Sequence, residues 1–171
     1  QIEKTLEKTL KEIEELKQKY QKQTISLLKT WYPKKSNKQQ FFRAIKFNEK
    51  GRIEIEDIDL SRTPLPSLYI PSIIEVKKLD VSGCNLQSLS SENLPPSIEV
   101  IDASGNKNLN QLNLKDLPNL KILDVLFCNL QSLSSENLPP SIEEIYANGN
   151  ENLNQLNLKD LPNLKKLDVS F

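Results

Sequence analysis

Two cysteines and a column of aspartates are the side chains that could carry out chemistry in this sequence. The cysteines are Cys84 and Cys128, and the aspartates recur at a regular spacing as Asp59, Asp80, Asp102, Asp124 and Asp168. A thiolate can act as a nucleophile or join a disulfide, and carboxylates can hold calcium. Histidine is absent, which removes the usual general base and the commonest metal ligand. We therefore expect no enzyme activity, no cofactor and no metal site.

These side chains recur because the sequence repeats. Residues 76–119 and 120–163 are two units of 44 residues that differ at eight positions. A strand-like spacing, apolar-x-x-apolar-x-apolar, begins at residues 55, 76, 98, 120, 142 and 164, and a Thr, Cys or Asn follows at the ninth position of the first five of these segments. This pattern is typical of leucine-rich repeats. We expect an α/β fold, in which residues 53–171 form a leucine-rich-repeat solenoid with a curved parallel sheet and an irregular or 3₁₀ convex side.

The repeat pattern decides between the possible roles of the two cysteines. Cys84 and Cys128 occupy equivalent positions two repeats apart. Strands spaced by ~4.8 Å place them roughly 9–10 Å apart, beyond the ~7 Å limit for the Cα atoms of a disulfide. Without a histidine to activate them, and with burial expected at this position, we expect reduced structural thiols. The repeats are about 22 residues long, and the array stops inside a strand, as if truncated at its C-terminus.

Residues 1–52 differ from the repeats in charge and in pattern. They hold fourteen Lys and Arg against six Asp and Glu, whereas residues 53–171 hold nine against seventeen. The apolar spacing of residues 2–28 predicts an amphipathic helix that either packs on the end of the solenoid or forms a coiled-coil or dimer contact. A capping-box pattern at residues 36–39 predicts a second helix that reaches residue 47. We therefore expect a cap of two α-helices, basic overall.

The basic and aromatic residues within 31–47 also have the composition of a nucleic-acid or anionic-lipid site. A capping helix accounts for the same residues, because it needs large apolar side chains to seal a core and lysines to solvate its outer face. We therefore expect no nucleic-acid partner. No apolar run approaches the ~18 residues of a membrane span.

The differences between the two units indicate where function lies. Six of the eight substitutions fall at outward-facing strand positions of the concave face, while the convex loops are identical. This concentration predicts a protein-binding surface on a rigid sheet. The alternative is a structural element in which the basic N-terminal helix meets the acidic repeats of another copy. The expected partner-binding residues are Lys78, Val100, Asp102, Ile122, Asp124, Leu126, Phe127, Glu144, Tyr146 and Asn148.

One stretch of a repeat resembles a known family. The residues Leu-Pro-Pro-Ser-Ile-Glu at 94–99, with the Asn at 106, resemble the repeats of bacterial type III secreted leucine-rich-repeat effectors, in their Yersinia outer protein M and IpaH-like branches. The Trp-Tyr-Pro at 31–33 looks similar to the helical cap of that family. The resemblance implies an effector that acts in the host cytoplasm, with the concave face binding a host protein or a ubiquitin-ligase substrate. No ligase domain is present in this sequence, and Cys128 lacks the Cys-x-Asp context of the ligase nucleophile. Without that resemblance, we expect a cytoplasmic protein.

Overall fold

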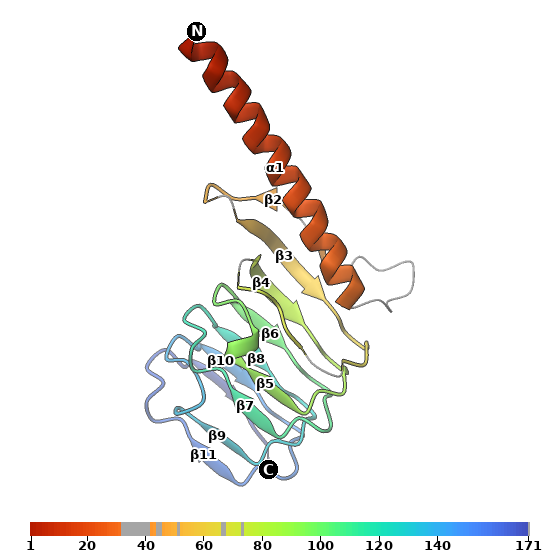
Figure 1. Cartoon of the computed structure of the whole chain (residues 1–171). Coiled ribbons are helices and arrows are strands. Elements are labelled where there is room, and N and C mark those ends of the chain that lie inside the picture. Colours follow the sequence, from red (N-terminus) through yellow and green to blue (C-terminus); the bar gives the residue numbers. More distant parts are fainter. Residues whose placement is uncertain (32–41, 44–45, 51, 66–67, 73, 171) are drawn as a thin grey trace.

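The described part of the chain folds into a long helix and a parallel β-solenoid (Figure 1). The computed structural model describes all residues except 32–41, 44–45, 51, 66–67, 73 and 171. The helix α1 spans Ile2–Trp31. The solenoid begins at Ile53, the first residue of β3, and each of its turns adds one strand to the main sheet. The solenoid architecture expected from the repeats is confirmed.

The main sheet runs in the order β1-β3-β4-β6-β8-β10-β12, and β2 also pairs with β3. From β3 onwards all neighbours are parallel, and successive repeats stay in register. The parallel strands are β3 (Ile53–Asp59), β4 (Ile74–Asp80), β6 (Val100–Asp102), β8 (Ile122–Asp124), β10 (Glu144–Tyr146) and β12 (Lys166–Asp168).

Inward-pointing strand residues build the core as the apolar spacing predicts. Leu79, Leu123 and their neighbours at the first and sixth positions of the first five strand segments are buried, and Leu117 and Leu138 fill the convex half. In the last segment Leu164 and Val169 are partly buried. The convex side is more regular than expected. Among the residues that the structure describes, it contains one 3₁₀ helix, η1 (Ser91–Asn93), and two small parallel sheets. These pair β5 (Ser88–Ser90) with β7 (Gln111–Asn113) and β9 (Ser132–Ser134) with β11 (Gln155–Asn157).

The ninth residue of each repeat holds the turn after the strand. Asn106 Nδ2 donates to the carbonyls of Val81 and Ala103, and its Oδ1 accepts from the Leu86 amide at 2.9 Å. Asn150 makes the same three bonds one unit later. These bonds satisfy backbone groups that the solenoid interior would otherwise leave unpaired.

The two cysteines take the same place with weaker bonds. Cys84 Sγ lies 3.0 Å from the Leu60 carbonyl and Cys128 Sγ lies 3.3 Å from that of Ala103. Both cysteines are buried, as expected. The pKa of Cys128 is raised to about 11, mainly by burial, so its thiol stays protonated.

The segment after α1 is not the second helix that the sequence predicts, wherever it is described. β1 (Phe42–Arg43) and β2 (Lys46–Phe47) instead pair antiparallel with β3. The rest of the predicted helix, including its capping-box start at residues 36–39, lies outside the described residues. Phenylalanine favours strands, and the solenoid's first strand would otherwise present an open edge. Pairing with β3 covers that edge.

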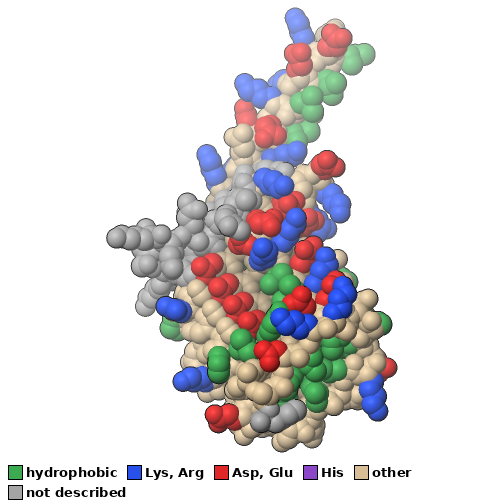
Figure 2. Space-filling view, turned by 180° about the vertical axis from the view of Figure 1, so that it is seen from behind, with side chains coloured by type: hydrophobic (Ala, Val, Ile, Leu, Met, Phe, Trp, Pro, Cys, Tyr) green, Lys and Arg blue, Asp and Glu red, His purple; other side chains and the backbone are tan. Residues whose placement is uncertain are grey.

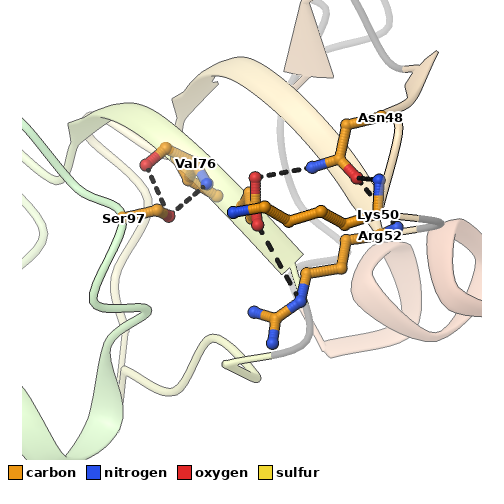
Figure 3. Close-up of polar contacts among 6 residues, drawn as sticks. Asn48, Lys50, Arg52, Val76 and Ser97 are labelled. Atoms are coloured by element: carbon orange, nitrogen blue, oxygen red, sulfur yellow. Dashed lines mark hydrogen bonds and ion pairs between the residues drawn. The ribbon is translucent and has the colours of Figure 1, made fainter.

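The turn between β2 and β3 is anchored to β4 (Figure 3). Asn48 Oδ1 accepts from the Lys50 and Arg52 amides, while Asn48 Nδ2 donates to the Glu75 carboxylate at 2.6 Å. Arg52 Nε lies 3.8 Å from the same carboxylate. Ser97 then bridges the backbone N–H and C=O of Val76. The hairpin is thereby tied to the first turns of the solenoid.

The helix α1 does not pack its apolar side chains on the solenoid over its N-terminal half. Figure 1 shows this half extending away from the sheet, and Ile2, Leu6, Leu10, Ile13 and Leu16 are 44–86% exposed. For these residues the expectation of a helix packed on the solenoid end is wrong. Periodicity identified the apolar face correctly but could not say what covers it.

Candidate functional site

The parallel register gathers the predicted binding residues into three columns on one face of the main sheet. Lys78, Val100, Ile122 and Glu144 lie side by side in the first column. Asp80, Asp102, Asp124 and Tyr146 form the second. The third follows the strand ends, where amide-to-carbonyl bonds join each turn to the next, and it consists of Ser82, Ser104, Leu126 and Asn148.

An apolar patch occupies the middle of this face. It consists of Val100, Ile122, Leu126 and Phe127, of which the first three are half-buried and Phe127 is 61% exposed. Figure 2 shows this side of the molecule, with a row of acidic side chains and hydrophobic side chains close to one end of the row. Lys78 borders the patch on β4, and Glu144, Tyr146 and Asn148 border it from β10 onwards. The structure therefore brings the residues predicted from sequence together.

The aspartates of the second column shape the turns. Asp80 Oδ1 accepts from the Ser82 amide, and Asp102 Oδ1 accepts from that of Ser104, each at 2.9 Å. Asp124 does the same for Leu126 at 3.0 Å. An aspartate that bonds the amide two residues on closes a local turn. The aspartates of this column therefore stabilise the turns, and their carboxylates also place negative charge on the face.

The surroundings of Asp124 raise the pKa of its carboxyl group. Burial raises its pKa, and the charges of Asp102 and Asp80 raise it further, while the bond from the Leu126 amide opposes them. A row of carboxylates at the spacing of parallel strands repels itself. A cationic group on a partner would relieve that repulsion.

Phe127 is held in a backbone conformation that glycine normally takes. Its φ is 54°, in the left-handed region. At the equivalent turn position Gly83, Gly105 and Gly149 have φ of 62°, 69° and 77°, and Arg62, the residue there in the first repeat, has φ of 58°. An L-residue pays roughly 1–2 kcal/mol for the left-handed conformation. The protein thus carries local strain while presenting a large aromatic side chain to solvent.

The ring of Phe127 lies over Gly149. A Cβ built on Gly149 would collide with Cδ1 of Phe127, whereas a Cβ on Gly105 would meet only backbone atoms of Gly83, at 3.8 Å or more. The next turn therefore leaves the space that this ring uses. Contact with Gly149 therefore holds the exposed ring of Phe127 in one position on the surface.

A polar cluster adjoins the patch on β10 and β12. The Tyr146 hydroxyl donates to the Glu144 carboxylate and accepts from Lys166 Nζ at 2.9 Å. Lys166 Nζ also lies 4.6 Å from the centroid of the Tyr146 ring. The bond to Tyr146 is the main cause that raises the pKa of Lys166. These contacts fix the Tyr146 ring beside the apolar patch.

Sequence reasoning missed Gly149 and Lys166. Gly149 is equivalent to Gly105 in the first unit, so a comparison of the positions at which the units differ does not reveal it. Lys166 belongs to the strand after the second unit, outside the compared segment. A signal for Gly149 was present, because Gly recurs at this turn position at residues 83, 105 and 149, whereas Arg62 and Phe127 depart from it.

The described residues were compared with the requirements of a metal site and of a membrane-spanning helix. No group of three or more His, Cys, Asp or Glu side chains within the described part of the chain could hold a metal ion. No described helix has the length and apolarity needed to cross a membrane. The face offers an aromatic anchor, aliphatic neighbours and carboxylates, which is chemistry for binding.

Comparison with known proteins gives no relative. No protein-family model, no characterised protein and no solved structure matches the chain.

Proposed function

We propose that this protein is a protein-interaction module, a leucine-rich-repeat solenoid that binds a partner protein on the concave face of its main sheet. The observation that carries the proposal is Phe127, which is 61% exposed and strained in the left-handed region. Exposed aromatics at the centre of a surface are common hot spots, and backbone strain tends to persist where function uses it. A turn with Gly at this position would be less strained and about equally stable.

The shape and charge of the face describe the partner. The apolar patch suits an aliphatic or aromatic side chain, and the adjacent Asp102 and Asp124 suit a lysine or arginine next to it in sequence. Residues 53–171 carry nine basic against seventeen acidic side chains, which also favours a basic partner. The proposed ligand is an exposed protein segment that combines an apolar anchor with basic neighbours.

The resemblance to secreted bacterial effectors extends this proposal. On that reading, the protein binds a host protein in the host cytoplasm, or selects the substrate of a ubiquitin ligase whose catalytic part lies outside this sequence. The motif at 94–99 supports the extension. Pull-down of a host protein that binds wild type but not a patch variant would support it, and a partner that contacts only the convex loops would argue against it.

Selection from a random peptide library displayed on phage tests the binding face and needs no identified partner. The library would be panned on the wild-type chain and, in parallel, on the variant Leu126→Ser/Phe127→Gly. That variant restores the residues of the equivalent turn, Ser82 and Gly83. We expect wild type to enrich peptides with an aromatic or aliphatic residue next to lysine or arginine, and the variant not to retain them.

A control variant on the convex side completes this test. Lys115→Ala lies on the opposite side of the solenoid, where its side chain is exposed. It should bind the selected peptides as wild type does. Peptides that bind the patch variant and wild type equally well would show that the patch is not the recognition surface.

Charge-driven self-assembly is the competing proposal. Its support is the opposite charge of residues 1–52 and 53–171. Screening weakens contacts between exposed charges as salt rises. Light scattering across salt concentrations separates the two proposals, since an assembly that dissociates with added salt supports this one, whereas a mass that does not change with salt rules it out.

A further inference from the structure

We propose that the N-terminal half of α1 pairs with the same segment of a second copy of this chain as an antiparallel two-helix coiled coil. The apolar stripe of α1, defined as Ile2, Leu6, Leu10, Ile13 and Leu16, is 44–86% exposed. Helices in proteins gain most of their stability from packing an amphipathic face. The N-terminal half of α1 extends away from the solenoid (Figure 1), and its apolar stripe is exposed, so another helix can reach it. The proposal is independent of the concave face.

The spacing of the stripe fits a two-stranded seam. Leu6 and Ile13 are seven residues apart, as are Ile2 and Thr9, and Thr9 and Leu16. These two series occupy the a and d positions of a heptad repeat. In an antiparallel pair an a residue faces a d residue of the partner helix. Leu6 then faces Leu16, and Ile13 faces Thr9.

Charge favours the antiparallel orientation and a second copy as the occupant. Residues 1–15 hold three lysines and five glutamates, while residues 16–31 hold four lysines and no acidic residue. Antiparallel pairing sets the acidic half of one helix against the basic half of the other, and a parallel pair would set like against like. Helix dipoles are opposed favourably in the same arrangement.

Individual flanking positions support this orientation. Glu3 and Lys17 both flank the seam at e positions and meet across an antiparallel interface, twice per dimer. Leu10 is also an e residue, which leaves it off the seam of a parallel pair. In the antiparallel pair it lies opposite its own copy near the two-fold axis. On the other side of the seam, Glu12 at a g position faces Glu12 of the second copy. This is the like-charge contact among the flanking positions of the antiparallel pair.

Sedimentation of the full chain at increasing concentration tests the association. We expect the mass to rise from that of one chain, 19.6 kDa, to twice that value, and to remain there when salt is added. Ile13→Lys should return the protein to one chain, because it places a charge in the seam while lysine still favours helix. Lys11→Gln, on the opposite face of the helix, is the matched control and should dimerise as wild type does.

Cross-linking tests the orientation. Under oxidation, Leu10→Cys should form a covalent dimer, because the two copies of this residue meet only in the antiparallel pair. Thr9→Cys should cross-link much less, since equivalent d residues are direct neighbours only in a parallel pair. Wild type, whose Cys84 and Cys128 are buried, controls for native thiols. Strong cross-linking of Thr9→Cys and not of Leu10→Cys would overturn the orientation.

Glu12→Gln gives a reading that does not depend on new cysteines. It removes the like-charge contact of the antiparallel pair and should therefore tighten dimerisation. In a parallel pair the same glutamate would face Lys17 of the other helix, and the substitution would weaken it. A wild-type chain that stays monomeric at all concentrations overturns the proposal. So does a monomer that binds phosphatidylcholine–phosphatidylserine vesicles and loses that binding on Ile13→Lys, because the stripe would then be a lipid-binding face.

Discussion

The turns that follow β4 and β8 share one backbone and differ in what they present. In the first, Ser82 and Gly83 form the turn, and Gly83 takes a φ of 62° without strain. In the second, Leu126 and Phe127 occupy the equivalent positions, with Phe127 at 54°. The Asp80 and Asp124 side chains close the two turns in the same way. The difference shows that the scaffold accepts an L-residue in the left-handed region at this turn position, as it also does at Arg62, and that the turn after β8 uses it to present an exposed aromatic.

The neighbouring turns, which contain Gly105 and Gly149, also differ in their surroundings. Gly105 and Gly149 are equivalent, yet only Gly149 lies under an aromatic ring. The same residue type thus has two different reasons to be present. In the first unit the left-handed backbone alone requires glycine, whereas in the second the ring of Phe127 adds a steric requirement.

The largest effect should come from the residue that both units share. Asn106→Ala and Asn150→Ala each remove three hydrogen bonds from buried backbone groups, so each should lower the free energy of unfolding by about 3 kcal/mol or more. Denaturant unfolding measures it. Cys84→Ala, where the thiol bond is weak, should cost only about 1 kcal/mol. Clearly unequal losses for the two asparagines would show that the units are not equivalent scaffolds.

A smaller effect should separate the two glycines. Gly105→Ala should cost about 1 kcal/mol, the penalty of a left-handed L-residue. Gly149→Ala should cost about 2 kcal/mol, because the new methyl group also displaces the Phe127 ring. In a Phe127→Gly background the stability cost of Gly149→Ala should fall to that of Gly105→Ala. A cost of Gly149→Ala that does not change with Phe127 would contradict the ring contact.

Exchanging the two turns should give a still smaller, asymmetric result. Gly83→Phe should cost about 1 kcal/mol because it introduces left-handed strain. Phe127→Gly should change stability by less than about 0.5 kcal/mol, since relief of strain offsets the lost ring contact and the greater freedom of glycine in the unfolded chain. Thermal and urea unfolding of both variants measure the asymmetry. If Phe127→Gly proved the more damaging change, the ring would be a structural element.

The smallest effect concerns the charge beneath the patch. The raised pKa of Asp124 means that the unfolded chain ionises this carboxyl first, so wild type loses stability as pH rises from about 3.8, its ordinary value, through the folded pKa. Asp124→Asn keeps an acceptor for the Leu126 amide and removes the charge. It should stabilise slightly at pH 7 and not at all at acid pH. Unfolding across pH measures it, and a gain that persists at acid pH would exclude charge as its cause.

The repeats made much of this molecule predictable. Equal spacing sets the register of parallel strands, and the register gathers Val100, Ile122 and Asp124 on one face without further information. The turn role of Asn106 follows from the same spacing, because a residue after every strand meets the same unpaired backbone. Local repetition therefore predicts the scaffold and the position of the site.

Features that do not repeat were harder to predict. β1 and β2 are too short to show a strand period, and their pairing with β3 depends on an edge that only the fold creates. The apolar stripe of α1 has a clear period, which says nothing of what lies against it. The strain at Phe127 depends on the sign of φ, and a phenylalanine by itself predicts the opposite sign.

Paired measurements of binding and stability on the variant Leu126→Ser/Phe127→Gly decide whether the apolar patch is the recognition surface. The affinity of the best wild-type-selected peptide would be measured by titration calorimetry, and the free energy of unfolding by urea titration. We predict binding at least about tenfold weaker, which corresponds to roughly 1.4 kcal/mol, with stability within about 1 kcal/mol of wild type. Undiminished affinity for the variant would contradict the claim that Phe127 and its neighbours form the recognition surface.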